Sequence, residues 1–128
     1  MIKFNNKSIP YGKQKIDKID ANFVKSSTLS KLITTGPSVI KFEKNITKYL
    51  KSKYSFTCSS GTAAIHLAFL SIGLKKGDNI IMPAVNFIAA YNLAKIMGAN
   101  IFLADVDPVT GQMTPKNLTN CIKKNKIK

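Results

Sequence analysis

Three short apolar runs, each followed by turn residues and then by a helical stretch, most constrain how this chain can fold. They cover residues 54–58, 79–82 and 101–104. Runs of this length without a sustained polar alternation are typical of strands in a sheet that helices cover on both faces. The repeated order of strand and helix therefore predicts an α/β fold with a largely parallel sheet.

Turn and cap residues bound the expected helices. These are predicted over residues 15–26, from Pro37 onward, over 62–72, over 87–97 and from Pro115 onward. Pro37 suits the first turn of its helix, while Gly73 and Gly98 are typical residues just after a helix end. Asn86 is the expected N-cap of the helix over 87–97, and Thr114 that of the last helix.

Ligands of parallel sheets bind beyond the carboxyl ends of the strands, which here are residues 59–62, 83–87 and 105–107. The first of these turns leads straight into an apolar helix. The free N–H groups and positive dipole end of such a helix favour an anion, and phosphate above all. Gly61 lets the backbone approach a ligand closely, and Thr62 adds a hydroxyl donor. Small residues there are also ordinary turn chemistry, so these residues indicate a phosphate-bearing ligand without naming it.

The formal charge of +14 is what a nucleic-acid-binding protein would show, but the composition argues against that function. None of the 20 basic residues is arginine, the side chain that specific readout of phosphates and bases usually enlists. The lysines are spread along the chain, apart from the tail over 123–128. We therefore expect no specific nucleic-acid partner, only a salt-sensitive attraction to polyanions.

The cysteines and the lengths of the apolar runs bear on disulfides, metal sites and membrane attachment. Cys58 and Cys121 lie far apart without metal-ligand spacing, so neither a disulfide framework nor a metal site is expected. No apolar run reaches the length of a membrane span, and the first residues lack the pattern of a signal peptide. A cytoplasmic location without membrane attachment is the expectation.

Four segments in this order carry a family resemblance: SGTAAIHLA at 60–68, GDNIIMP at 77–83, NFIAA at 86–90 and GANIFLADVD at 98–107. They resemble the DegT/DnrJ/EryC1/StrS family of nucleotide-sugar aminotransferases, which depend on pyridoxal 5′-phosphate (PLP). Two upstream stretches, 9–14 and 32–43, are similar to the N-terminal segments of that family. The resemblance thus runs from about residue 9 to the last helix.

The resemblance implies a fold of the aspartate aminotransferase type, fold type I, of which this chain would be the N-terminal part. Residues 1–36 would form an arm, a helix and a substrate-side loop, and residues 37–128 an incomplete large domain. The family's Schiff-base lysine and the aspartate that pairs with the pyridine nitrogen come later, so this chain would lack them. We therefore expect a truncated reading frame or a fragment, without catalytic residues and inactive alone.

The resemblance also assigns site residues. Thr62 and Ala63 would hold the cofactor phosphate, and Phe87 would stack on the pyridine ring, although without the family Phe87 is better explained as a core residue. We interpret Asp105 and Asp107 as turn and capping residues, and His66 as a packed helical histidine. Lys31 is equally explained as a solvated loop lysine. The residues that would contact a sugar nucleotide are Tyr11, Lys31, Leu32, Ile33, Thr34 and Gly61.

The implied reaction of the parent protein transfers an amino group, with glutamate as donor, to C4 of a UDP-4-keto-6-deoxy-N-acetyl sugar. The segment IPYGKQ at 9–14 is most similar to the branch that leads to pseudaminic acid, within surface polysaccharide or nonulosonic acid biosynthesis. A homodimer is implied for the full-length protein. Two alternatives stay open. One is a PLP-dependent sugar dehydratase with histidine in place of the lysine. The other is a stand-alone, non-catalytic phosphate- or nucleotide-binding module.

Overall fold

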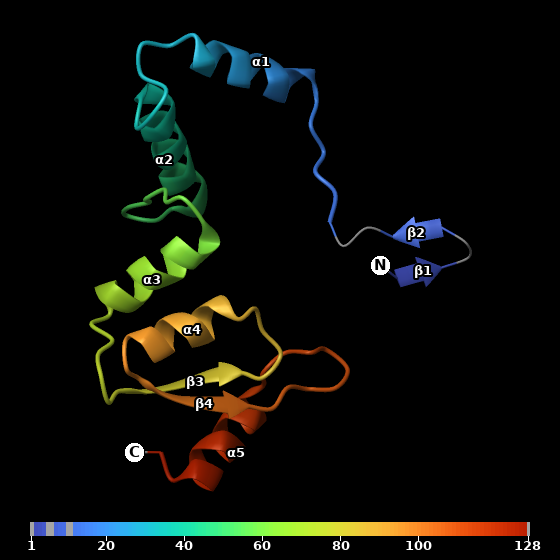
Figure 1. The fold of residues 1–128 in the computed structure, drawn as a ribbon, viewed down its shortest axis with the longest axis vertical. Helices are drawn as coiled ribbons and strands as arrows, with labels where there is room; N and C mark the ends of the chain where they lie inside the picture. Colours follow the sequence, from blue (N-terminus) through green and yellow to red (C-terminus); the bar gives the residue numbers. More distant parts are fainter. Residues whose placement is uncertain (1, 5–6, 10–11, 128) are drawn as a thin grey trace. The chain divides into compact units, whose positions relative to one another are not determined.

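The computed structural model describes residues 2–4, 7–9 and 12–127 of the chain (Figure 1). It separates into two compact units, Met1–Phe56 and Thr57–Lys128, which are described one at a time. Among the described residues, no helix combines the length and the apolar character that crossing a membrane requires.

The first unit contains a hairpin and two helices. Strand β1 (Ile2–Phe4) pairs antiparallel with β2 (Lys7–Ile9), a hairpin that the sequence pattern did not predict. Helix α1 (Lys18–Thr28) begins later than expected because Asp17 caps it. The Asp17 carboxylate accepts the N–H groups of Ile19 and Asp20, and Asp20 returns a bond to the Asp17 N–H, which completes a capping box.

Helix α2 (Pro37–Leu50) lies where the sequence predicted it, with Pro37 in its first turn. The expected strand over 54–58 is wrong, because this segment has no regular secondary structure and pairs with no described strand. Ser55 is instead held against α2, where its Oγ donates to the Glu43 carbonyl at 2.6 Å and lies 2.8 Å from Thr47 Oγ1. An apolar pattern makes a strand only where a neighbour completes the hydrogen-bond ladder.

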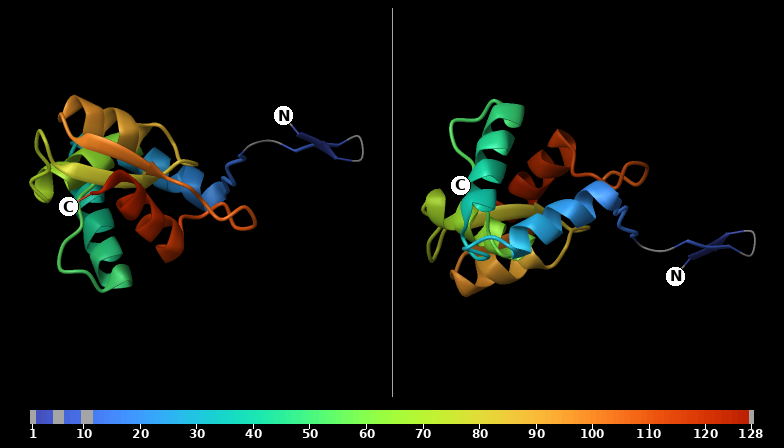
Figure 2. Two further views of the ribbon diagram at one scale, coloured as in Figure 1. Left: turned by 90° about the horizontal axis from the view of Figure 1, so that it is seen from below. Right: turned by 90° about the horizontal axis from the view of Figure 1, so that it is seen from above.

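The second unit is a small α/β layer structure. Strands β3 (Asn79–Pro83) and β4 (Asn100–Ala104) pair in parallel, in a register from Asn79 opposite Asn100 to Pro83 opposite Ala104. Helix α4 (Ala89–Ile96) covers one face and α5 (Pro115–Asn125) the other (Figures 1 and 2). Helix α3 (Gly61–Ser71) packs on α4. These elements confirm the predicted α/β class with a parallel sheet.

The core of this unit is built mainly from small side chains. Its buried apolar residues are Met82, Ala89, Ala94, Ala104 and Cys121. Alanines on α4 and at the end of β4 let the helix approach the sheet closely. Hydrogen bonds also connect the residues around the starts of β3 and β4. The Gly77 N–H donates to the Gly98 carbonyl at 3.0 Å, and Asn100 Nδ2 donates to the Gly77 carbonyl at 3.0 Å.

The two cap predictions for this unit had different outcomes. Thr114 caps α5 as expected, because its Oγ1 accepts the Asn117 N–H while Asn117 Oδ1 accepts the Thr114 N–H. The predicted cap at Asn86 is wrong, because α4 begins at Ala89 and Ile88 occupies its N-cap position. Asn86 Oδ1 instead accepts the N–H of Phe87 at 2.8 Å, within a turn that keeps Phe87 outside the helix.

Candidate functional site

The start of α3 leaves two backbone donors free. Ser60 is the N-cap, and its Oγ accepts the N–H of Ala63 at 3.1 Å. The first bond within the helix runs from the Ala64 N–H to the Ser60 carbonyl at 3.0 Å. Among the described residues nothing accepts the N–H groups of Gly61 and Thr62. These donors stand at the positive end of the helix dipole, which suits an anion.

Gly61 has no structural reason of its own to be glycine. Its φ lies outside the left-handed region, and a Cβ built on it would meet no atom within 4 Å. Neither backbone conformation nor packing in this structure therefore demands glycine at this position. Open space above the first helical turn, next to an exposed Thr62 hydroxyl, is what a closely approaching ligand needs.

Ser60 is a functional candidate that the sequence analysis did not single out. The signal was present, because a serine directly before a helical run is a common cap. The bond from Ala63 to Ser60 also bears on the role expected for Ala63. A phosphate that took the Ala63 N–H would displace the Ser60 hydroxyl, so these two acceptors compete for one donor.

Phe87 lies in the loop between β3 and α4 with 75% of its surface exposed. It is therefore not a core residue of this unit, in contrast to the explanation that the residues alone favoured. Val85 and Ile88 beside it are exposed as well. Helices α3 and α4 pack on each other, and both begin at the end of the unit where β3 and β4 finish (Figure 1). Thr62 and Phe87 thus come from the same end of the unit.

The expected sugar-nucleotide residues lie mainly in the first unit. Lys31, Leu32, Ile33 and Thr34 form an exposed loop between α1 and α2. Ser30 Oγ donates to the Leu32 carbonyl at 2.9 Å, and buried Gly36 closes the loop so tightly that a Cβ there would lie 2.3 Å from the same carbonyl oxygen. Tyr11 lies outside the described residues, and Gly61 belongs to the second unit.

The carboxylates of Asp105 and Asp107, after β4, accept hydrogen bonds from the following loop, which agrees with their interpretation as turn and capping residues. Asp107 Oδ1 accepts the Thr110 N–H at 2.8 Å, Thr110 Oγ1 at 3.0 Å and the Val109 N–H at 3.1 Å. These bonds, those from Thr110 above all, hold the pKa of Asp107 below its ordinary value because they stabilise the charged form. Asp105 Oδ1 accepts the N–H of Val106 at 2.9 Å.

His66 does not fit its expected role as a packed histidine, because its side chain is exposed. The neighbouring Leu67 and Leu70 are also about half exposed. Among the elements of the second unit, α3 packs chiefly on α4, which covers only one side of the helix. The apolar composition of α3 led to the wrong prediction, because the burial of a side chain depends also on which elements surround the helix.

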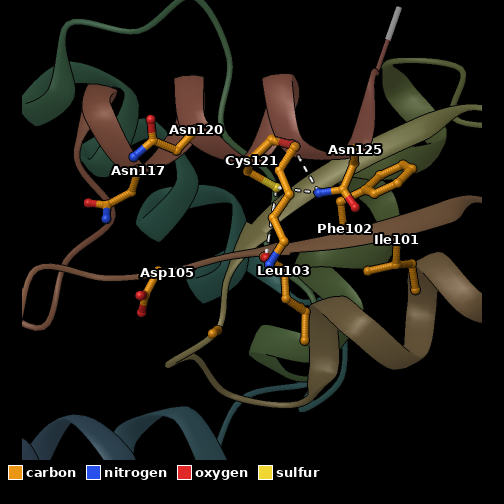
Figure 3. Close-up of a pocket in the computed structure, with 10 residues that line it drawn as sticks. Ile101, Phe102, Leu103, Asp105, Asn117, Asn120, Cys121 and Asn125 are labelled. Atoms are coloured by element: carbon orange, nitrogen blue, oxygen red, sulfur yellow. Dashed lines mark hydrogen bonds between the residues drawn. The ribbon is translucent and has the colours of Figure 1, made fainter.

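A cavity with a volume of about 590 Å³ lies elsewhere, between β4 and α5 (Figure 3). Asp105 and Cys121, which the sequence analysis discussed, are among the residues that line it. The Cys121 thiol donates to the Leu103 carbonyl at 3.7 Å, and Asn125 Nδ2 donates to the Cys121 carbonyl at 2.9 Å. Because these polar groups already bond one another, we place the candidate site at the start of α3 and not in this cavity.

Comparison with known proteins connects this geometry to a family. A profile of the DegT/DnrJ/EryC1/StrS aminotransferase family matches residues 14–127. A curated Shewanella sediminis protein, UDP-4-amino-4-deoxy-L-arabinose–oxoglutarate aminotransferase, is 31% identical over 103 residues, which are 80% of this chain and 26% of that protein.

Solved structures agree with the profile. A Streptococcus pneumoniae protein titled a sugar aminotransferase, in its PLP form, matches with a TM-score of 0.81 and 26% identity over 91% of this chain and 30% of its own. The GDP-4-keto-6-deoxy-D-mannose-3-dehydratase of E. coli, with bound hydrated PLP, matches with a TM-score of 0.72 and 30% identity over 78% of this chain and 27% of its own. The chain thus spans less than a third of the length of these relatives. Its sequence and its fold place it in the DegT/DnrJ/EryC1/StrS aminotransferase family.

Proposed function

We propose that this chain supplies the phosphate-binding part of a PLP-dependent aminotransferase that acts on a nucleotide sugar. One observation carries the proposal: the start of α3 offers the unpartnered N–H groups of Gly61 and Thr62 beneath open space. Membership of the family supports it, as do relatives solved in PLP and PMP forms. The catalytic lysine would come from the part of the family's length that this chain does not cover.

The residues present fit the cofactor phosphate. Among the described residues, no acceptor bonds the backbone N–H groups of Gly61 and Thr62, and the exposed Thr62 brings a hydroxyl as a further donor. The helix dipole adds favourable charge, and the missing side chain of Gly61 allows close approach. When bound, PLP supplies an electron sink for the amino group transfer, while the protein binds and orients it.

Phe87 has the exposure that a stacking residue needs before its ligand is bound. An offset stack on the pyridine ring would fix the plane of that ring, with a gain on the order of 1 kcal/mol beyond surface burial. The same contact would exclude water from one side of the reacting carbon. Val85 and Ile88 would extend this apolar wall.

The nucleotide sugar would contact the loop of Lys31, Leu32, Ile33 and Thr34, together with Tyr11 and Gly61. The Lys31 ammonium suits a diphosphate, since its charge stands on an exposed loop. The relative from Shewanella sediminis, named for a UDP sugar, supports a UDP-linked substrate. We propose amination at C4 of a UDP-4-keto-6-deoxy-N-acetyl sugar with glutamate as donor, in the branch toward pseudaminic acid, by a cytoplasmic homodimer.

A second candidate function is the removal of a sugar hydroxyl group by a PLP-dependent dehydratase. The match to the E. coli dehydratase favours it, because its 30% identity is close to that of the aminotransferases. The phosphate-binding role of α3 would be the same in both. The residue that takes the place of the catalytic lysine separates them, and it lies outside the family segment that this chain covers.

The test uses a polypeptide of the family's length, in which residues 14–127 replace the matching segment of the Streptococcus pneumoniae protein. We call it the exchange protein. Thr62→Val should weaken PLP binding about 10- to 100-fold, because the loss of a hydrogen bond to a charged group costs about 1.5–3 kcal/mol. The matched control is Thr119→Val, whose hydroxyl donates to a carbonyl of α5. Cofactor titration is the measurement, and unchanged affinity in the Thr62 variant would contradict the assignment.

Conversion of the PLP form to the PMP form by glutamate, followed by absorbance, tests the aminotransferase reaction itself. Because lysine amines react with the PLP aldehyde and this chain has 20 basic residues, all lysine, affinity is best measured also with pyridoxine 5′-phosphate. That ester keeps the phosphate and lacks the aldehyde. Loss of its binding in Thr62→Val would assign the effect to the phosphate site.

A further inference from the structure

The loop between α1 and α2, residues 29–36, folds back closely on its own backbone at Gly36 (Figure 1). A Cβ built on Gly36 would lie 2.3 Å from the Leu32 carbonyl oxygen and 3.3 Å from the carbonyl carbon. Among the glycines that the structure describes, no other would place a Cβ so close to a backbone atom, and the tight contact of Gly98 is mainly with the flexible side chain of Lys76. The missing side chain of Gly36 therefore permits this close approach.

Gly36 has little freedom to move away from the contact. It is buried and extended, with a φ of −82° and a ψ of −174°, and it is the N-cap of α2. Pro37 follows directly, and the residue before a proline is disfavoured in the helical region. The Gly36 carbonyl also accepts the Val39 N–H at 3.0 Å. A side chain at position 36 would therefore displace the Leu32 carbonyl, and the loop around it would move.

The Leu32 carbonyl has a second contact, from the side of α1. Ser30 Oγ donates to it at 2.9 Å and lies 2.7 Å from the Ser27 carbonyl in the last turn of α1. Ser27 Oγ in turn lies 3.4 Å from Ser38 Oγ in the first turn of α2. Serine hydroxyls thus connect the loop to α1, and α1 to α2.

Thr35 shows that the loop is held against a local backbone preference. Its φ of 47° lies in the left-handed region, where a β-branched residue is an outlier. In the part of the chain that the structure describes, the other non-glycine residues with a positive φ are Lys51 and Lys126, and both are C-caps of helices. Thr35 ends no helix. Strain of this kind persists where surrounding contacts maintain it, and it is concentrated at ligand-binding segments.

We infer that Gly36 and Ser30 are positioning residues for a nucleotide sugar. They fix the Leu32 carbonyl and so set the backbone of the loop that presents Lys31 and Ile33. The exposed Lys31 offers an ammonium group to a diphosphate, and the exposed Ile33 offers an apolar surface to a base or sugar ring. A loop that is already ordered loses less conformational entropy when its ligand binds. This inference rests on the function proposed above for the loop, and it assigns part of the affinity to residues that act through the loop.

The test needs a host whose nucleotide sugar is named. In the UDP-sugar exchange protein, the 103 matched residues of this chain replace their counterparts in the Shewanella sediminis protein, whose name states UDP-4-amino-4-deoxy-L-arabinose and oxoglutarate. The PLP form is mixed with the UDP sugar and the PMP form with oxoglutarate, and absorbance follows each half-reaction by itself. A general loss of folded protein would slow both half-reactions, whereas a displaced sugar loop would slow only the first.

Gly36→Ala should slow the half-reaction with the UDP sugar about 10- to 100-fold, because a misplacement of about 1 Å has effects of this size. The half-reaction with oxoglutarate should change little. Titration calorimetry with UDP gives a readout without turnover and should show weaker binding in the same variant.

Ser30→Ala is a second variant, in case Gly36→Ala does not fold. It should slow the half-reaction with the UDP sugar about two- to tenfold, as expected for the loss of one neutral hydrogen bond. Ser30→Thr keeps the hydroxyl and should restore the rate. The matched control is Ser26→Ala, whose hydroxyl donates to the Phe23 carbonyl of α1 at 2.9 Å, and both half-reactions should be unchanged in it.

Two results would overturn the inference. One is a parallel loss in both half-reactions of the folded variants, which would make the role of Gly36 and Ser30 purely structural. The other is an unchanged rate with the UDP sugar and unchanged UDP affinity in both variants. Failure of the proposed function is distinguishable, because the unmutated UDP-sugar exchange protein would then neither bind PLP nor react with oxoglutarate.

Discussion

The Ser60 hydroxyl accepts the backbone N–H of Ala63 at 3.1 Å. A phosphate bound at the start of α3 could accept the same N–H, so the two acceptors compete for it. The serine stabilises the helix when no anion is present. An anion that binds there either leaves this bond intact and uses the N–H groups of Gly61 and Thr62, or displaces the hydroxyl.

Replacing Ser60 separates these two possibilities. In the exchange protein, Ser60→Ala should cost about 0.5–2 kcal/mol of stability when no cofactor is bound, as loss of an N-cap usually does. If phosphate displaces the hydroxyl, the variant should regain part of this loss on binding pyridoxine 5′-phosphate, and thermal melts with and without the ester will show it. An equal loss in both melts would mean that the Ser60–Ala63 bond persists in the complex.

Phe87→Leu keeps an apolar side chain in the loop after β3 and removes the aromatic ring. Because Phe87 is mostly exposed, we expect little change in stability, but a shifted cofactor absorbance or a several-fold weaker affinity in the exchange protein. Phe56→Leu is the matched control, since Phe56 is likewise exposed. A large drop in melting temperature with an unaltered cofactor spectrum would assign Phe87 to packing instead.

Asp107 should make the loop after β4 sensitive to acid. Hydrogen bonds from Thr110 and Val109 lower its folded pKa beneath the unfolded value of about 3.9. The stabilisation is therefore fully present above that unfolded value and is lost as the pH falls through the folded pKa. Asp107→Asn should lower stability at neutral pH, and the difference from the unmutated protein should shrink as the pH falls through the folded pKa of Asp107.

The Thr110 amide reports this carboxylate directly, because it donates to Asp107 Oδ1. Its NMR shift should titrate with a midpoint below 3.9, and the titration should vanish in Asp107→Asn. A midpoint at or above the ordinary aspartate value would show that these hydrogen bonds do not favour the charged form.

The chain of residues 1–128 alone should neither catalyse transamination nor remain a stable monomer. Large apolar side chains stay exposed on several elements, among them Phe23 on α1, Leu50 on α2 and Leu67 on α3. Exposed patches and open strand edges of this kind favour association. Analytical ultracentrifugation with a thermal melt is the measurement. A cooperative melt from a soluble monomer would support the stand-alone binding module.

Sequence patterns predicted those elements whose signals are local. Thr114 and Pro115 mark the start of α5 by themselves, and Gly98 marks the turn after α4. The segment over 54–58 was misjudged because a strand needs a partner, which no local pattern supplies. Asn86 was misjudged because its carboxamide has two backbone uses, as a helix cap or within a turn, and tertiary structure selects between them.

Some residues of the candidate site could be predicted from local sequence patterns, and others could not. Gly61 and Thr62 follow from the chemistry of a helix start and need no homologue. Exposure of Phe87 could not be predicted, since an aromatic residue before a helix is usually buried against it. The roles of Lys31, Leu32, Ile33 and Thr34 rest on the resemblance alone, because an exposed loop carries no pattern that specifies a ligand.

The bond between the Gly77 N–H and the Gly98 carbonyl has a consequence for the order of folding. It closes a single local loop that contains β3 and α4, and Asn100 immediately continues the closure by bonding back to Gly77 and Asn79. Contacts so near in sequence form quickly, because little chain entropy is lost in closing them. During synthesis on the ribosome, the β3–α4–β4 segment can therefore assemble before the residues of α5 have emerged.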